Sequence, residues 1–72
     1  MGYNNSYRAF AQKMEEERTA KAVAKRDALK AILENTTKDD EKAALEYAIY
    51  LIERMHSLRS FTQEEVFHFE NL

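Results

Sequence analysis

Apolar side chains recur at steps of three and four residues along three stretches of the chain, the spacing that lines residues up on one face of an α-helix. The first stretch covers residues 6–34, the second residues 38–58 and the short third residues 62–70. Proline is absent and the one glycine is Gly2, so no residue interrupts helix propagation within these stretches. The pattern predicts an all-α fold over one small domain, residues 1–72, with the first two helices paired as an antiparallel hairpin.

Turn and cap residues mark the expected helix ends. Residues 35–37 read Asn-Thr-Thr, so we expect Asn35 to end the first helix in the left-handed conformation and Thr36 or Thr37 to cap the second. Further along, Thr62 and Glu65 have the spacing of a capping box, in which each residue satisfies the other's backbone N–H group. We therefore predict that the third helix starts at residue 62.

The second helix is apolar over more of its circumference than one neighbouring helix would cover. Its main seam, which we expect to face the first helix, consists of Ala44, Ala48, Leu51, Met55 and Leu58, and it is widened by Leu45 and Ile52. The first helix offers a matching stretch of small residues at Ala20, Ala24, Ala28 and Ala31, flanked by Val23, Leu29, Ile32 and Leu33. Because Tyr47, Ile49 and Tyr50 fall outside the seam, we predict a second contact surface there, through which two copies dimerise into a helical bundle.

An aromatic stripe occupies the start of the first helix. Tyr3, Tyr7, Phe10 and Met14 follow one another at steps of four, three and four. The first helix is the longer of the two, and its excess length lies at this end, beyond the reach of the second helix. Two interpretations remain open, because the stripe could pack against the aromatic residues of the C-terminal segment or bind a partner protein, including another copy.

Charged residues agree with antiparallel pairing. A turn near residue 36 makes the numbers of facing residues sum to about 73, which brings together four pairs of opposite sign: Lys30 with Glu41, Arg26 with Glu46, Lys21 with Glu53, and Glu15 with Arg59. Such exposed pairs select an arrangement more than they stabilise it. Arg18 and Arg54 also meet this sum, so we expect them either to point to different sides of the hairpin or to contact something else.

Composition narrows the class of protein. A chain of 72 residues buries only about 60% of its unfolded surface. Cysteine is absent, so neither a disulfide nor a thiolate metal site can stabilise the fold. Self-association is the remaining way to stabilise so small a domain. No apolar run approaches the roughly 20 residues that a bilayer requires, and the first residues lack the pattern of a secretion signal. We expect a cytoplasmic protein without a membrane segment.

A basic run gives an alternative hypothesis. Arg18, Lys21, Lys25, Arg26 and Lys30 are interrupted by one acidic residue in their midst, and such a run could contact the phosphates of a nucleic acid. Against this hypothesis, no aromatic residues for base stacking are interleaved with the run, and the net charge of the chain is −2. The facing carboxylates of the second helix are the simpler partners for these side chains.

No pattern of residues indicates catalysis, a cofactor or a metal ion. The two histidines, His56 and His68, fall on different predicted elements, and no nucleophile with a neighbouring base or glycine-rich phosphate loop is present. The sequence therefore predicts a protein that is not an enzyme: a small helical protein–protein interaction module, a regulator or inhibitor of another protein. This step rests on analogy with small bacterial and phage-encoded regulators. The alternatives are a nucleic-acid-binding module and a purely structural homo-oligomer.

Overall fold

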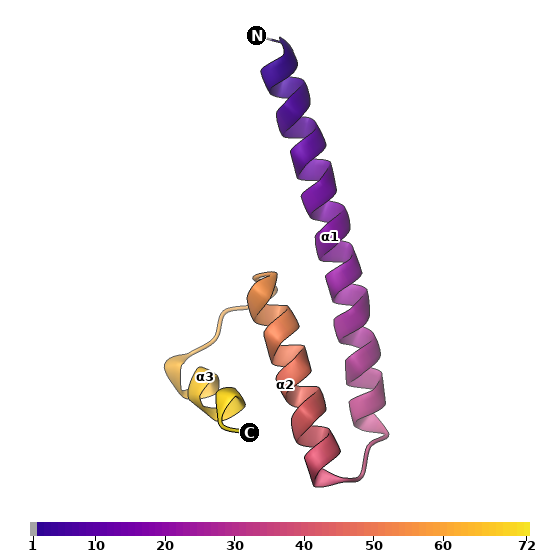
Figure 1. The fold of residues 1–72 in the computed structure, drawn as a ribbon, viewed down its shortest axis with the longest axis vertical. Helices are drawn as coiled ribbons and strands as arrows, with labels where there is room; N and C mark the ends of the chain where they lie inside the picture. Colours follow the sequence, from indigo (N-terminus) through magenta and orange to yellow (C-terminus); the bar gives the residue numbers. More distant parts are fainter. Residues whose placement is uncertain (1) are drawn as a thin grey trace.

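The computed structural model describes the backbone of residues 2–72 and the side chains from residue 7 onward. Its three helices are α1 (Gly2–Glu34), α2 (Asp39–Met55) and α3 (Gln63–Glu70), and the described residues contain no strand. Figure 1 shows α1 and α2 as an antiparallel hairpin, with α3 on the side of α2 away from α1. The predicted all-α fold is confirmed, although α1 starts four residues earlier and α2 ends three residues earlier than predicted.

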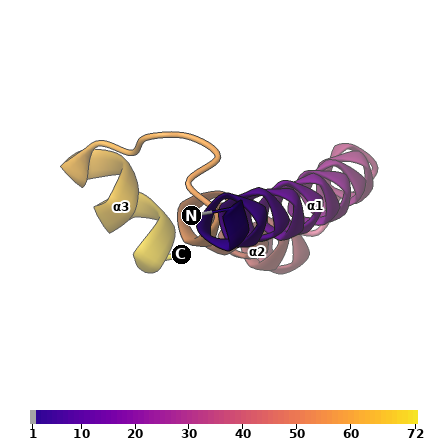
Figure 2. The ribbon, with the colours of Figure 1, turned by 90° about the horizontal axis from the view of Figure 1, so that it is seen from above.

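The chain is elongated. Its Cα atoms span 56 × 27 × 12 Å with a radius of gyration of 16.3 Å, whereas a compact domain of this length would have a radius near 11 Å. The cause is the N-terminal half of α1, which continues well past the end of α2, while α3 lies to one side of the hairpin (Figures 1 and 2). The predicted excess length of the first helix at its N-terminus is thus confirmed.

The connection between α1 and α2 differs from its prediction. Asn35 Nδ2 donates a hydrogen bond to the carbonyl of Ala31 at 3.0 Å, and Thr36 Oγ1 donates one to the carbonyl of Ile32 at 2.7 Å. Both side chains therefore satisfy the free carbonyls at the end of α1. Asn35 does not adopt a positive φ, and the N-cap of α2 is Lys38, which makes no side-chain capping bond.

The end of α2 is a Schellman motif, which explains why the helix stops before residue 58. Ser57 has a φ of 52°. The Ser57 N–H donates to the Arg54 carbonyl at 3.3 Å and the Leu58 N–H donates to the Glu53 carbonyl at 2.8 Å. At the start of α3, the predicted capping box of Thr62 and Glu65 is present in both directions.

The contact between α1 and α2 uses a different face of α1 from the predicted alanine stretch. Ala22 is buried, with Val23, Leu29 and Leu33 half-buried around it. The alanines expected to form this contact are all exposed: Ala20, Ala24, Ala28 and Ala31. Val23, Leu29 and Leu33, which were predicted to flank this stretch, gain more from burial than its alanines do, so they turn inward together with Ala22.

The predicted seam of α2 is also mostly outside the core. Leu51 and Met55 are 41% and 77% exposed, whereas Ile49, which lies outside the seam, is buried. Leu45 and Ile52, which widen the predicted seam, are half-buried. Because α2 packs against α1 on one side and α3 on another, its third apolar side is left uncovered. The spacing of apolar residues on α2 does not by itself determine which of its three apolar sides are buried.

The register of the hairpin is shifted from the predicted sum of 73. Arg26 Nη1 lies 3.3 Å from Glu53 Oε2, so these facing residues sum to 79. In Figure 1 the connecting loop runs on past the end of α1 before α2 begins, which displaces α2 along α1. None of the four predicted ion pairs forms in the part of the chain whose side chains are described. Arg54 instead turns to α3, where it contacts Glu70 at 3.3 Å.

Tyr50 is the centre of the contact between α2 and α3. It is 1% exposed, and its ring stacks on Phe69 and meets the edge of Phe61, both with ring centroids 5.1 Å apart. The prediction that the N-terminal aromatic residues could join this cluster is wrong, because α3 lies on the opposite side of α2 from α1. Tyr7 and Phe10 remain exposed.

Candidate interaction surface

One face of α1 carries no covering element along most of its length. Tyr7, Phe10 and Met14 are 74%, 64% and 45% exposed. Positions at the same helical spacing continue this face toward the C-terminal end of α1, and all of them are exposed. We call this the outward face of α1, comprising Tyr7, Phe10, Met14, Glu17, Lys21, Ala24, Ala28 and Ala31. Tyr3 has the same spacing, but its side chain lies outside the described residues.

The outward face points away from α2 because of the rotation per residue of the helix. Ala22, Arg26 and Leu29 face α2 and are buried or half-buried. The exposed alanines at 24, 28 and 31 each follow one of these positions by two residues, a rotation of about 200°. A molecule bound to the outward face would therefore meet neither α2 nor α3.

The predicted contact surface on α2 is only partly available to a partner. Ile49 and Tyr50 are buried within the chain, at 7% and 1% exposure, so they offer little surface to a second copy. Tyr50 stacks on Phe69, so the neighbour that covers this side of α2 is α3 of the same chain. Tyr47 is 39% exposed and, with Leu51 and Met55, leaves an apolar strip on the surface of α2.

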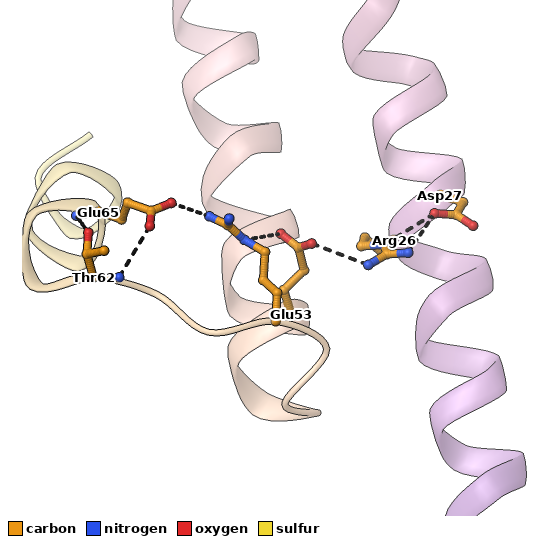
Figure 3. A network of polar contacts seen from close by, with 6 residues as sticks. Arg26, Asp27, Glu53, Thr62 and Glu65 are labelled. Atoms are coloured by element: carbon orange, nitrogen blue, oxygen red, sulfur yellow. Dashed lines mark hydrogen bonds and ion pairs between the residues drawn. The ribbon is translucent and has the colours of Figure 1, made fainter.

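A chain of ion pairs links the three helices (Figure 3). Glu53 is buried, and its carboxylate lies 3.3 Å from the Arg26 guanidinium on one side and 3.8 Å from that of Arg59 on the other. Arg59 in turn contacts Glu65 of α3 at 2.5 Å. Sequence reasoning missed this network because its members are far apart in the chain and depend on the shifted register.

The same network sets the ionisation of one carboxyl group. The pKa of Glu65 is lowered from its usual value, first by the hydrogen bond from Arg59 and then by the backbone N–H of Thr62. Among the described side chains, no buried nitrogen or oxygen atom lacks a hydrogen-bond partner. The network therefore fixes the relative positions of the helices and presents no unsatisfied polar group to a ligand.

The basic run does not form one continuous surface. Arg18, Lys21 and Lys25 are exposed on neighbouring sides of α1. Arg26, however, is held by Glu53 and by Asp27 at 3.2 Å. Lys30 lines a groove formed by all three helices, on a different side of α1. Three of the five predicted phosphate contacts thus share an accessible region.

The described residues contain no group of three or more carboxylate or histidine side chains that could hold a metal ion. Among the helices of the described chain, none has the length and apolar character needed to cross a membrane. No protein-family model, curated protein or solved structure matches the chain. The exposed apolar faces of α1 and α2 are accordingly the features on which a functional proposal can rest.

Proposed function

We propose that the protein is a small helical interaction module that binds a protein partner through the outward face of α1. The observation that carries this proposal is the projection of α1 past α2 with Tyr7, Phe10 and Met14 uncovered. An apolar stripe on an isolated helix is an aggregation hazard unless a partner buries it. Side chains at positions i, i+3 and i+7 are the anchors by which an amphipathic helix binds an apolar groove or another helix.

In this proposal the module acts as a regulator or inhibitor in the cytoplasm, where it occupies an apolar surface that its partner needs. Two features support this mode of action. The helix is already formed before binding, so little ordering cost opposes association, and α2 and α3 pack well away from the outward face and leave it accessible.

Site-specific photo-crosslinking tests the proposal. A photoreactive amino acid at position 10 should give a covalent adduct with a protein in cells that make the chain, because this position would be buried in the complex. The matched control is position 16, which is also exposed on the projecting half of α1 but lies outside the outward face. Absence of any adduct from position 10, or equal adducts from both positions, would contradict the proposal.

Nucleic-acid binding is the second candidate, because Arg18, Lys21 and Lys25 are exposed together. It predicts an affinity for DNA or RNA that falls steeply with salt, and that is lost when Lys21 and Lys25 are both changed to Glu. Failure to bind either nucleic acid at low salt would remove this candidate. A purely structural homo-oligomer remains the limiting case in which the partner is another copy and no other protein binds.

A further inference from the structure

We infer that the partner of the outward face is a second copy of this chain, which binds antiparallel through the same face. This inference rests on the proposed function, since it names the partner of the same surface. The outward face repeats every seven residues, with one series at positions 7, 14, 21 and 28 and the other at 10, 17, 24 and 31. Such a repeat is the pattern by which two helices pack along their length.

The two halves of the face are complementary in size. Toward the N-terminus the face carries the large side chains of Tyr7, Phe10 and Met14, whereas toward the C-terminus, beyond the charged pair Glu17 and Lys21, it carries alanines at 24, 28 and 31. When two copies run in opposite directions, the two series oppose each other at residue numbers that sum to 38. Tyr7 then lies opposite Ala31 of the second copy, Phe10 opposite Ala28 and Met14 opposite Ala24. Large residues would pack on small ones, which allows the helices to approach closely.

The charges in the middle of the face fit the same register. Glu17 lies opposite Lys21 of the second copy, and twofold symmetry forms this pair twice. On the flank of the face, Lys13 approaches Asp27 of the second copy. A parallel arrangement would instead place Glu17 against Glu17 and Lys21 against Lys21, so the charges select the antiparallel one. The unfavourable contact, between the two copies of Arg18, lies at the exposed edge, where solvent screens it.

The exposed area of the chain agrees with this interface. The chain exposes 6047 Å², roughly 1,400 Å² more than a folded monomer of its mass, 8.5 kDa, would expose. A stable interface buries about 800 Å² on each partner. Because α2 lies on the opposite side of α1, the second copy can cover the outward face without displacing either neighbouring helix.

A charge-exchange experiment tests the inference, with molar mass measured by sedimentation equilibrium over a range of concentrations. The wild-type chain should form a dimer. Glu17→Lys and Lys21→Glu should each weaken the dimer about tenfold or more, since both symmetric pairs become repulsive. Mixing these two variants should restore a dimer containing one copy of each, because opposite charges then face each other. Glu16→Lys, with the same change of net charge outside the face, should leave the dimer intact.

Repulsion within each variant chain is unchanged by mixing, so the recovery reports only on contacts between copies. A wild-type chain that stays monomeric at all concentrations, or two variants that do not recover when mixed, would overturn the inference. The crosslinking experiment at position 10 distinguishes failure of the homodimer inference from failure of the proposed function. An adduct of twice the chain mass supports the inference and the protein-binding role of the outward face, but not inhibition of another protein through that face. An adduct with a different protein overturns the inference alone, and no adduct removes the proposed function as well.

Discussion

Arg26 on α1 and Glu53 on α2 form the ion pair that fixes the register of the hairpin, with Nη1 and Oε2 3.3 Å apart. The Glu53 side chain is 9% exposed and that of Arg26 is 20% exposed. Attraction between charges is stronger in such a setting than at the surface, and removal of Arg26 leaves the Glu53 carboxylate with Arg59 alone, at 3.8 Å. The pair is therefore expected to be important for the stability of the fold.

Replacing Arg26 with Met keeps the apolar stem but removes the charge. We expect the free energy of unfolding to fall by about 2–4 kcal/mol, because the buried negative charge of Glu53 would then be balanced only by the more distant Arg59. Urea denaturation followed by circular dichroism at a fixed protein concentration measures this change. The control is Lys38→Met, which removes an exposed pair with Glu41 at 4.0 Å and should cost no more than about 0.5 kcal/mol. Equal losses for the two variants would contradict the account.

The backbone conformation of Ser57 indicates that a substitution at this position can stabilise the fold. Its φ of 52° lies in the left-handed region, which is strained for every residue except glycine and, to a lesser degree, asparagine. Ser57→Gly should raise the free energy of unfolding by up to about 1 kcal/mol, since glycine is the preferred residue at this position of a Schellman motif. Ser57→Val should lower it, because a β-branched side chain tolerates this conformation worst. Thermal unfolding of the two variants measures the difference, and a more stable valine variant would be inconsistent with the left-handed end of α2.

Two substitutions of Tyr50 separate the contribution of aromatic packing to stability from that of the hydroxyl group. The hydroxyl donates a hydrogen bond to Glu70 at 3.2 Å and accepts one from Arg54. Tyr50→Phe should cost about 0.5–1.5 kcal/mol, whereas Tyr50→Ala should cost about 3–5 kcal/mol and release α3 from α2. Hydrogen exchange of the α3 amide groups measures this release. If these amides stay protected in Tyr50→Ala, the aromatic cluster does not hold α3.

The local parts of this architecture could be predicted from the sequence. Helix class, the capping box of Thr62 and Glu65, and the projection of α1 depend on neighbouring residues or on helix length alone. The rotation of each helix about its axis could not be predicted, because both α1 and α2 have more than one apolar face. For this reason Ala24 and Met55 were assigned to the core, and both are exposed.

In the candidate site, too, the features that depend on local sequence or helix length could be predicted and the others could not. Exposure of Tyr7 and Phe10 follows from the length of α1 and was one of the two interpretations that the sequence left open. Burial of Tyr50 depends on how the residues 56–62 return α3 to α2, which no local pattern specifies. Glu53 was predicted to pair with Lys21 on the first helix, whereas its partners are Arg26 on α1 and Arg59 in the loop before α3, because the register of the hairpin is shifted.

Acid should loosen the contact of α3 through Glu65. Because the pKa of this carboxyl is lowered in the folded chain, its contribution to stability is complete above the unfolded pKa near 4.3 and is lost as the pH falls through the lower folded value. Near-ultraviolet circular dichroism from pH 7 to pH 2 follows the tyrosine environment. The variant Glu65→Gln keeps a capping side chain but cannot titrate, so it should lack this part of the acid transition. An unchanged transition would mean that other carboxyl groups account for it.

The central claim, antiparallel pairing through the outward face of α1, is tested most directly by the distance between spin labels on two copies. Ala9 is exposed and lies outside the outward face, so Ala9→Cys gives the cysteine-free chain a single labelling position. A register sum of 38 separates the two labels by roughly 30 Å along the helix axis. Pulsed electron paramagnetic resonance should therefore give one narrow distance of at least about 30 Å. The absence of coupling, or a distance below about 20 Å as expected for parallel helices in register, would contradict the account.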